Sequence, residues 1–183
     1  MSMLSHTQLV ELVKTNVIEG ALIENVNAAS IDVRLGPVVW RESMRSPGDR
    51  RVHLARKETP LMEKMDISEQ PYVLAPQKFC LAQTVEKFNL PNWLVATFFL
   101  KSSGARSGLD NALACFCDPG WHESVLTLEL RNSLSYHSLV LEAGMKIGQM
   151  VFHQVALVAQ DKSYAVRGQY NQDTESQPSK GLR

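Results

Sequence analysis

Three short segments of this 183-residue chain combine polar and ionisable residues in patterns that could carry chemistry. The first runs from Lys101 to Gly108 and contains two cations, three serines and two glycines after an apolar stretch. Hydroxyl groups and freed backbone N–H groups can line an anion site, and an arginine can hold two phosphate oxygens at once. The segment is therefore a candidate phosphate site, with an ordinary serine- and glycine-rich loop as the alternative.

The second segment places an acid inside an apolar strand. Between residues 125 and 131, leucines alternate with Thr127, Glu129 and Arg131, so the two sets face opposite sides of a strand. Removal of Glu129 from water would raise its pKa toward neutrality, which suits a general acid and base. The alternative is that Glu129 faces solvent and pairs with Arg131.

The third segment, Asp118-Pro119-Gly120-Trp121, has the composition of a turn. Asp118 either initiates this turn or presents a carboxylate to a pocket. In the second case Trp121 would offer a flat apolar surface to a ring.

Known metal and nucleotide motifs do not fit the chain. Zinc-dependent nucleobase deaminases carry His-x-Glu followed by Pro-Cys-x-x-Cys, but here a single residue separates Cys115 from Cys117. We interpret these two as core or pocket-wall thiols on one side of a strand, and we expect no zinc. His122-Glu123 lacks the second histidine of a zincin motif, and neither a Walker loop nor a dinucleotide glycine fingerprint occurs.

The elements that must position these segments are mostly strands. Ser5 to Gln8 fits a helix capping box, and the apolar spacing that follows predicts a helix over 5–19, stopped at Gly20. Strands are expected over 31–35, 72–74, 79–84, 94–100, 125–131, 138–141 and 149–158, with loops and short strands over 41–71. Many short strands separated by turn signals indicate a β-sandwich or barrel.

Bulk composition narrows the function classes. The formal net charge is zero, and the basic residues between Arg41 and Lys57 are interleaved with acids, so we expect neither a nucleic-acid nor a membrane partner. Three cysteines argue against a disulfide framework and for the cytoplasm. We see no signal peptide and no apolar run of the roughly 18 residues that span a bilayer.

Five segments, in order, resemble motifs of the dCTP deaminase family, which belongs to the trimeric dUTPase-like superfamily. They are Ser30–Gly36, Lys101–Leu109, Asp118–Trp121 with Leu128-Glu129, Ala143–Phe152, and Gln169–Gln172 with Pro178-Ser179. Each motif is modest, but five in this order are specific.

The resemblance implies a mainly β fold, a distorted barrel or jelly roll of the dUTPase-like (β-clip) type with a short N-terminal helix. Residues 1–166 would form the single domain and 167–183 a flexible C-terminal lid. It also implies a homotrimer with active sites between subunits. The expected ligands are dCTP and dUTP, with dTTP as a candidate inhibitor.

The activity implied is conversion of dCTP to dUTP and ammonia, which supplies dUTP for thymidylate synthesis. Glu129 would activate a water for attack on C4 of cytosine and then protonate the departing amino group. The substrate-binding residues would be Lys101, Ser102, Ser103, Arg106, Ala114, Asp118, Trp121, Thr127, Tyr164, Gln169 and Gln172. Mg²⁺ would be carried by the triphosphate, with no protein ligand and no zinc.

The chain departs from the family pattern at several positions. Lys101 stands where the family usually has Arg, and Gln169 where it usually has Lys. Glu129 follows Asp118 by 129 − 118 = 11 residues, one more than expected, and the stretch from Arg106 to Asp118 is one shorter. Either a β-bulge absorbs these shifts, or they mark a divergent enzyme.

Other functions therefore stay open beside the deaminase. One is a bifunctional enzyme that takes dCTP to dUMP, and another is a plain dUTP diphosphatase, although the glycine-rich aromatic tail typical of dUTPases is absent. A third is a deaminase for a modified cytosine nucleotide. The fourth is a non-catalytic nucleotide-binding trimer, against which Ser102, Arg106 and Glu129 together argue.

Overall fold

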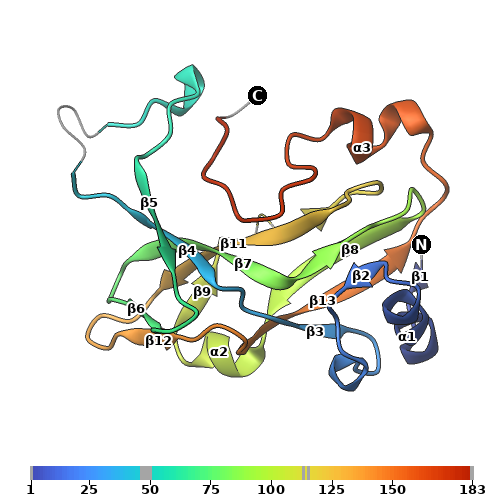
Figure 1. Ribbon diagram of the computed structural model, residues 1–183, viewed down its shortest axis with the longest axis horizontal. Coiled ribbons are helices and arrows are strands. Elements are labelled where there is room, and N and C mark those ends of the chain that lie inside the picture. Colours follow the sequence, from blue (N-terminus) through green and yellow to red (C-terminus); the bar gives the residue numbers. More distant parts are fainter. Residues whose placement is uncertain (1, 46–50, 113, 115, 182–183) are drawn as a thin grey trace.

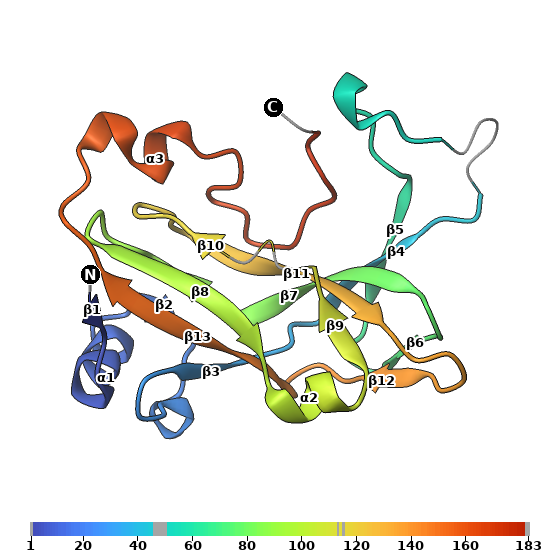
Figure 2. The same ribbon diagram turned by 180° about the vertical axis from the view of Figure 1, so that it is seen from behind.

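The computed structural model describes residues 2–45, 51–112, 114 and 116–181 (Figures 1 and 2). The chain is mainly β, as predicted. The first sheet joins β1 (Ser2–Met3), β13 (Lys146–Gln154), β8 (Leu94–Leu100) and β10 (Phe116–Cys117), and β3 (Ile31–Arg34) pairs with the same β13. All of these pairings are antiparallel.

The second sheet carries the catalytic candidate. It joins β5 (Met62–Asp66), β4 (Val38–Glu42), β7 (Phe79–Phe88), β11 (Ser124–Asn132) and β9 (Leu109–Asn111), with β2 (Ile18–Glu19) also paired to β7. A separate pair is formed by β6 (Tyr72–Leu74) and β12 (Leu139–Leu141). Among the described residues, no strand pairing closes the two larger sheets into one barrel.

The core is built from the inward faces of both large sheets. Leu128 and Leu130 of β11 belong to the same buried cluster as Phe98 of β8 and Phe152 of β13. The alternation predicted for 125–131 is therefore confirmed, because the leucines enter the core while the residues between them face the other way.

The N-terminal helix is shorter than predicted. α1 (His6–Lys14) begins with the expected capping box, in which the Ser5 backbone N–H donates to Gln8 Oε1 at 3.0 Å. The prediction of helix through residue 19 is wrong after Lys14. Asn16 adopts a left-handed conformation (φ 59°), and Ile18 pairs with β7 as part of β2. β-branched residues such as Ile18 fit a strand better than the end of a helix.

Other boundaries shift by a few residues. The region 41–71 holds the end of β4, the strand β5 and a 3₁₀ turn, η2 (Leu54–Arg56). A second such turn, η1 (Ile23–Asn25), precedes β3. The candidate phosphate segment forms α2 (Ser102–Arg106) instead of a loop. No helix in the described part of the chain is long and apolar enough to cross a membrane.

After β13 the chain passes through η3 (Gln160–Lys162) and α3 (Tyr164–Arg167), and the tail then returns across β11 (Figures 1 and 2). The Val125 N–H donates to the Asp173 carbonyl at 3.0 Å. Ser176 is fully buried, and its N–H donates to Gln83 Oε1 at 2.9 Å. The tail thus lies docked on the second sheet; its flexibility as a lid stays a prediction.

Candidate active site

A cavity of about 500 Å³ lies between the second sheet, β10 and the docked tail. The structure brings six of the predicted site residues to its wall: Ala114, Asp118, Trp121, Thr127, Glu129 and Tyr164. They come from four separate parts of the chain, and the fold brings them together around one cavity.

Glu129 is the carboxylate with the most unusual surroundings. Its neighbours Leu128 and Leu130 are buried, and Leu81 lies opposite on β7. Its Oε2 atom is buried and has no hydrogen-bond partner among the described residues. Burial raises the pKa of this carboxyl above its ordinary value. A carboxyl whose pKa is raised keeps its proton to a higher pH than an exposed one, which suits a general acid and base.

The alternative role for Glu129 is wrong. Arg131 Nη2 donates to Gln77 Oε1 at 2.9 Å, so its guanidinium has another partner. The Glu129 carboxylate faces the cavity rather than a surface ion pair.

The spacing between Asp118 and Glu129 is not absorbed by a bulge in β11. Where the β11–β7 register shifts, the two steps from Val125 to Thr127 match four steps on β7, from Lys87 to Gln83. The additional residues at this irregularity therefore lie in β7. β11 itself has no extra residue there that would offset the longer spacing from Asp118 to Glu129.

The turn of Asp118 and Trp121 forms one end of the cavity. Gly120 has a left-handed backbone (φ 86°), and a Cβ there would overlap Ser163 Oγ, so glycine is required. The Trp121 ring stacks on Phe88 with centroids 5.4 Å apart, which fixes its plane. Partial burial raises the pKa of Asp118.

Tyr164 connects the cavity wall to the tail. The Ser163 hydroxyl caps α3 by accepting from the Ala165 N–H at 3.3 Å, and this places Tyr164 in the first turn. The Tyr164 hydroxyl accepts from the Tyr170 N–H at 3.3 Å, and its carbonyl accepts from Asn171 Nδ2 at 2.6 Å. Burial raises the pKa of its phenol.

The tail residues that line the cavity differ from those predicted. Gln169 Nε2 donates to the Gly181 carbonyl at 3.4 Å, and Gln172 Nε2 donates to Glu123 Oε2 at 3.2 Å. Neither lines the cavity. The tail side chains that do are Tyr170, Asp173, Gln177 and Ser179. The structure therefore brings other residues of the predicted segment to the cavity wall, and the substrate-binding roles of Gln169 and Gln172 stay a prediction.

The candidate phosphate segment lies away from this cavity. In both views α2 is at the edge of the molecule opposite the tail (Figures 1 and 2). Ser102, Ser103 and Arg106 are exposed there and do not line the cavity. Lys101 Nζ forms an ion pair of 2.8 Å with the buried Asp32. Within this chain, these four residues and Glu129 do not meet.

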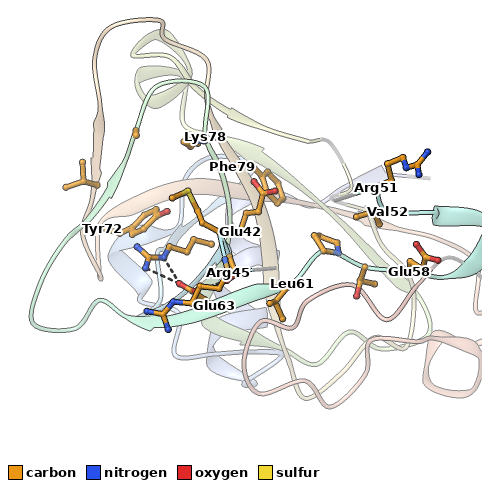
Figure 3. Close-up of a pocket in the computed structure, with 17 residues that line it drawn as sticks. Glu42, Arg45, Arg51, Val52, Glu58, Leu61, Glu63, Tyr72, Lys78 and Phe79 are labelled. Carbon is orange, nitrogen blue, oxygen red and sulfur yellow. Dashed lines mark hydrogen bonds and ion pairs between the residues drawn. The ribbon is translucent and has the colours of Figure 1, made fainter. Parts of the chain in front are cut away.

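A second and larger cavity, of about 820 Å³, lies between β4, β5 and β6 (Figure 3). None of the predicted site residues lines it. The Arg41 guanidinium pairs with Glu63 at 3.0 Å, and the Ser43 hydroxyl donates to the same carboxylate at 2.6 Å. This ion pair agrees with the expectation that acids balance the basic residues between Arg41 and Lys57. The cavity beside Glu129 remains the candidate active site.

The cysteine and histidine residues are placed separately. Cys117 is buried and lines the first cavity, as predicted, whereas Cys115 lies outside the described residues, which leaves its predicted orientation untested. The His122 ring makes a 2.9 Å contact with the Gly120 carbonyl through Nδ1. Within 2–45, 51–112, 114 and 116–181, no group of three His, Cys, Asp or Glu side chains could hold a metal ion.

The fold and the buried carboxylate place the chain among mainly β proteins with a candidate acid–base site. A crystal structure of 2′-deoxycytidine 5′-triphosphate deaminase from Agrobacterium tumefaciens has the same fold, with a TM-score of 0.64 at 21% identity. The match covers 84% of this chain and 49% of that chain. A family model described as dCTP deaminase-like matches residues 3–155, and the chain belongs to that family.

Curated relatives share about a third of the aligned residues. The Methanosphaerula palustris protein named "dCTP deaminase, dUMP-forming" is 36% identical over 126 residues, 68% of this chain and 64% of the relative. The Corynebacterium efficiens protein of the same name is 34% identical over 161 residues, 85% of this chain and 81% of the relative. The chain thus aligns with less than two thirds of the first of these relatives.

Proposed function

We propose that this chain is a dCTP deaminase that carries its product on to dUMP. The sequence alone favoured dUTP as the product, with the bifunctional enzyme as the alternative. Relatives 34% to 36% identical are named dUMP-forming, and this supports the alternative.

The observation that carries the deaminase proposal is Glu129 Oε2, which is buried and has no hydrogen-bond partner in the part of the chain that the structure describes. Glu129 would take a proton from a water as the water oxygen bonds to C4 of cytosine. It would pass that proton to N3 of the ring and then transfer the proton of the new C4 hydroxyl to the amino group, which leaves as ammonia as the C4 carbonyl forms. A pKa raised by burial suits a group that must hold the proton between these two steps.

The other lining residues would orient the nucleotide. Ala114 and Thr127 lie on the cavity wall with Glu129 and would position the water. Asp118 at the far turn would accept a hydrogen bond from the deoxyribose 3′-hydroxyl. Trp121 and Tyr164 would supply apolar ring surface at that end.

A complete site would need a second subunit. Ser102, Ser103 and Arg106 lie outside the cavity of their own chain, so in a homotrimer they would reach the triphosphate of a neighbour. Exposed apolar residues support association, because Phe99 is 47% and Phe116 is 62% exposed on adjacent strands of the first sheet.

Mg²⁺ would be bound through the triphosphate. Phosphate oxygens would be its main ligands, because Mg²⁺ prefers oxygen ligands and commonly binds nucleotides through their phosphates. dTTP would compete for the same cavity as a candidate inhibitor.

Product analysis tests the proposal. The purified protein is mixed with dCTP and Mg²⁺, with dUTP in a parallel tube. We expect ammonia, pyrophosphate and dUMP from dCTP. Accumulation of dUTP in the dCTP tube would instead indicate a monofunctional deaminase. Loss of dUTP in the parallel tube, with dCTP unchanged, would indicate a diphosphatase. No change in either tube would reject both activities and favour a modified cytosine nucleotide or a binding protein.

A further inference from the structure

The cavity wall carries acids and no cation of its own. Three carboxylates line it, those of Asp118, Glu129 and Asp173, whereas the lining residues that the structure describes include no Lys, Arg or His. A nucleoside triphosphate would bring further negative charge into this space. A cation must therefore reach the phosphates from outside the wall.

Lys180 lies directly behind that wall. Its ammonium is 3.1 Å from Oδ1 and 3.0 Å from Oδ2 of Asp173, and it donates to the Gln169 carbonyl at 3.1 Å. It also lies 4.8 Å from the centroid of the Tyr170 ring, and the Lys180 backbone N–H donates to the Tyr170 hydroxyl at 3.0 Å. Two of these partners, Tyr170 and Asp173, line the cavity.

We infer that Lys180 is the tail residue that binds the substrate's phosphates, and that Asp173 holds its ammonium at the cavity wall until they arrive. The inference rests on the proposed function, because it takes the ligand to be a nucleoside triphosphate.

The geometry allows the ammonium to change partners. The Lys180 side chain is 38% exposed, and ion pairs in such surroundings are weak. A phosphate offers more charge and several acceptor oxygens, and charge-assisted hydrogen bonds to it are strong. The ammonium needs only to turn from Asp173 toward the space that Asp173 already lines.

Lys180 also supplies a positive charge near position 169, where the family usually has a lysine. Gln169 is uncharged, and its side chain makes a bond to Gly181, away from the cavity. The Lys180 ammonium lies against the Gln169 carbonyl, so the tail still brings a positive charge to this place.

The test compares three variants, K180Q, K180R and K64Q. Lys64 is the matched control, because it pairs with Glu175 of the tail but does not line the cavity. KM and kcat for dCTP are measured at low and high salt, and Kd is measured for dCTP and for deoxycytidine, which lacks phosphates.

We expect K180Q to raise KM and Kd for dCTP about 10-fold or more, the loss of one hydrogen bond to a charged group. The salt dependence of KM should flatten, and Kd for deoxycytidine should not change. K180R should restore dCTP binding, and K64Q should behave as wild type.

Unchanged dCTP binding in K180Q, or an equal loss of dCTP affinity in K64Q, would overturn the inference. Lys180 would then serve only to dock the tail. If wild type does not turn over dCTP, the proposed function fails separately. The Kd for inorganic tripolyphosphate then decides, since weaker binding in K180Q alone supports the inference and equal binding in all variants overturns it.

Discussion

The indole N–H of Trp121 donates a hydrogen bond of 2.7 Å to the carbonyl of Tyr170, and this bond joins the cavity wall to the tail that covers it. The Trp121 ring also stacks on Phe88, so one side chain joins the core strand β7 to the tail. The nearby Gln172 N–H donates to the His122 carbonyl at 3.2 Å, which adds a second contact between the tail and this turn.

Replacement of Trp121 by Phe should loosen the tail while the ring surface remains. One backbone-directed hydrogen bond is worth about 1 kcal/mol. Amide hydrogen exchange at residues 169–173 should therefore quicken about five-fold, with little change in β7. Exchange at wild-type rates would show that the tail is held by its other contacts.

Replacement of Glu129 by Gln should abolish deamination while dCTP still binds. The amide keeps the size of the side chain but cannot accept the proton of the attacking water, so kcat should fall at least about 10²-fold. Glu69, which is exposed, provides the matched control E69Q, and its kcat should match that of wild type. Normal turnover in E129Q would remove Glu129 from the mechanism.

Stability should depend on pH through the same carboxyl. The folded-state pKa of Glu129 is raised above its ordinary value of 4.5, so the folded chain binds the proton more tightly than the unfolded chain. The stabilising effect of protonation is then complete below pH 4.5 and is lost as the pH rises through the raised pKa.

This dependence can be measured as a difference in Tm between E129Q and wild type. The Tm of E129Q should rise relative to that of wild type as the pH rises from about 4.5 to 8, because the amide never carries the buried charge. A constant difference across that range would mean that Glu129 is not desolvated in solution.

Subunit mixing should show whether the site is shared between chains. E129Q and R106A should each be inactive alone. In randomly mixed trimers, about one site in four would pair an intact Glu129 with an intact Arg106 of the neighbour. Recovery of about a quarter of wild-type activity would support shared sites, and no recovery in assemblies that contain both variants would reject them.

The sequence predicted features that depend on local pattern. The alternation around Glu129 showed which residues of β11 enter the core, and the Ser5–Gln8 box located the start of α1. The end of α1 could not be predicted, because Val17 continues the helical spacing, whereas the next residue, Ile18, lies in β2 and pairs with β7.

Features that depend on distant partners were not predictable. Arg131 turns away from Glu129 because Gln77, 54 residues earlier, offers it an acceptor. The tail presents Tyr170 and Asp173 to the cavity because Trp121 and Val125 bind the tail backbone, and side-chain spacing carries no sign of that docking.

The anchoring of the buried Ser176 has a consequence for when a product can leave the cavity. The Ser176 N–H and hydroxyl both donate to Gln83, and its carbonyl accepts from the Trp40 indole at 2.9 Å. The tail is therefore anchored between the two pairs of its residues that line the cavity, Tyr170 with Asp173 and Gln177 with Ser179. Under the proposed function, dUTP formed beneath the tail leaves only when this fastening opens. The lifetime of the closed tail would then set the partition of dUTP between escape and hydrolysis, and with it the amount of free dUTP that the enzyme releases.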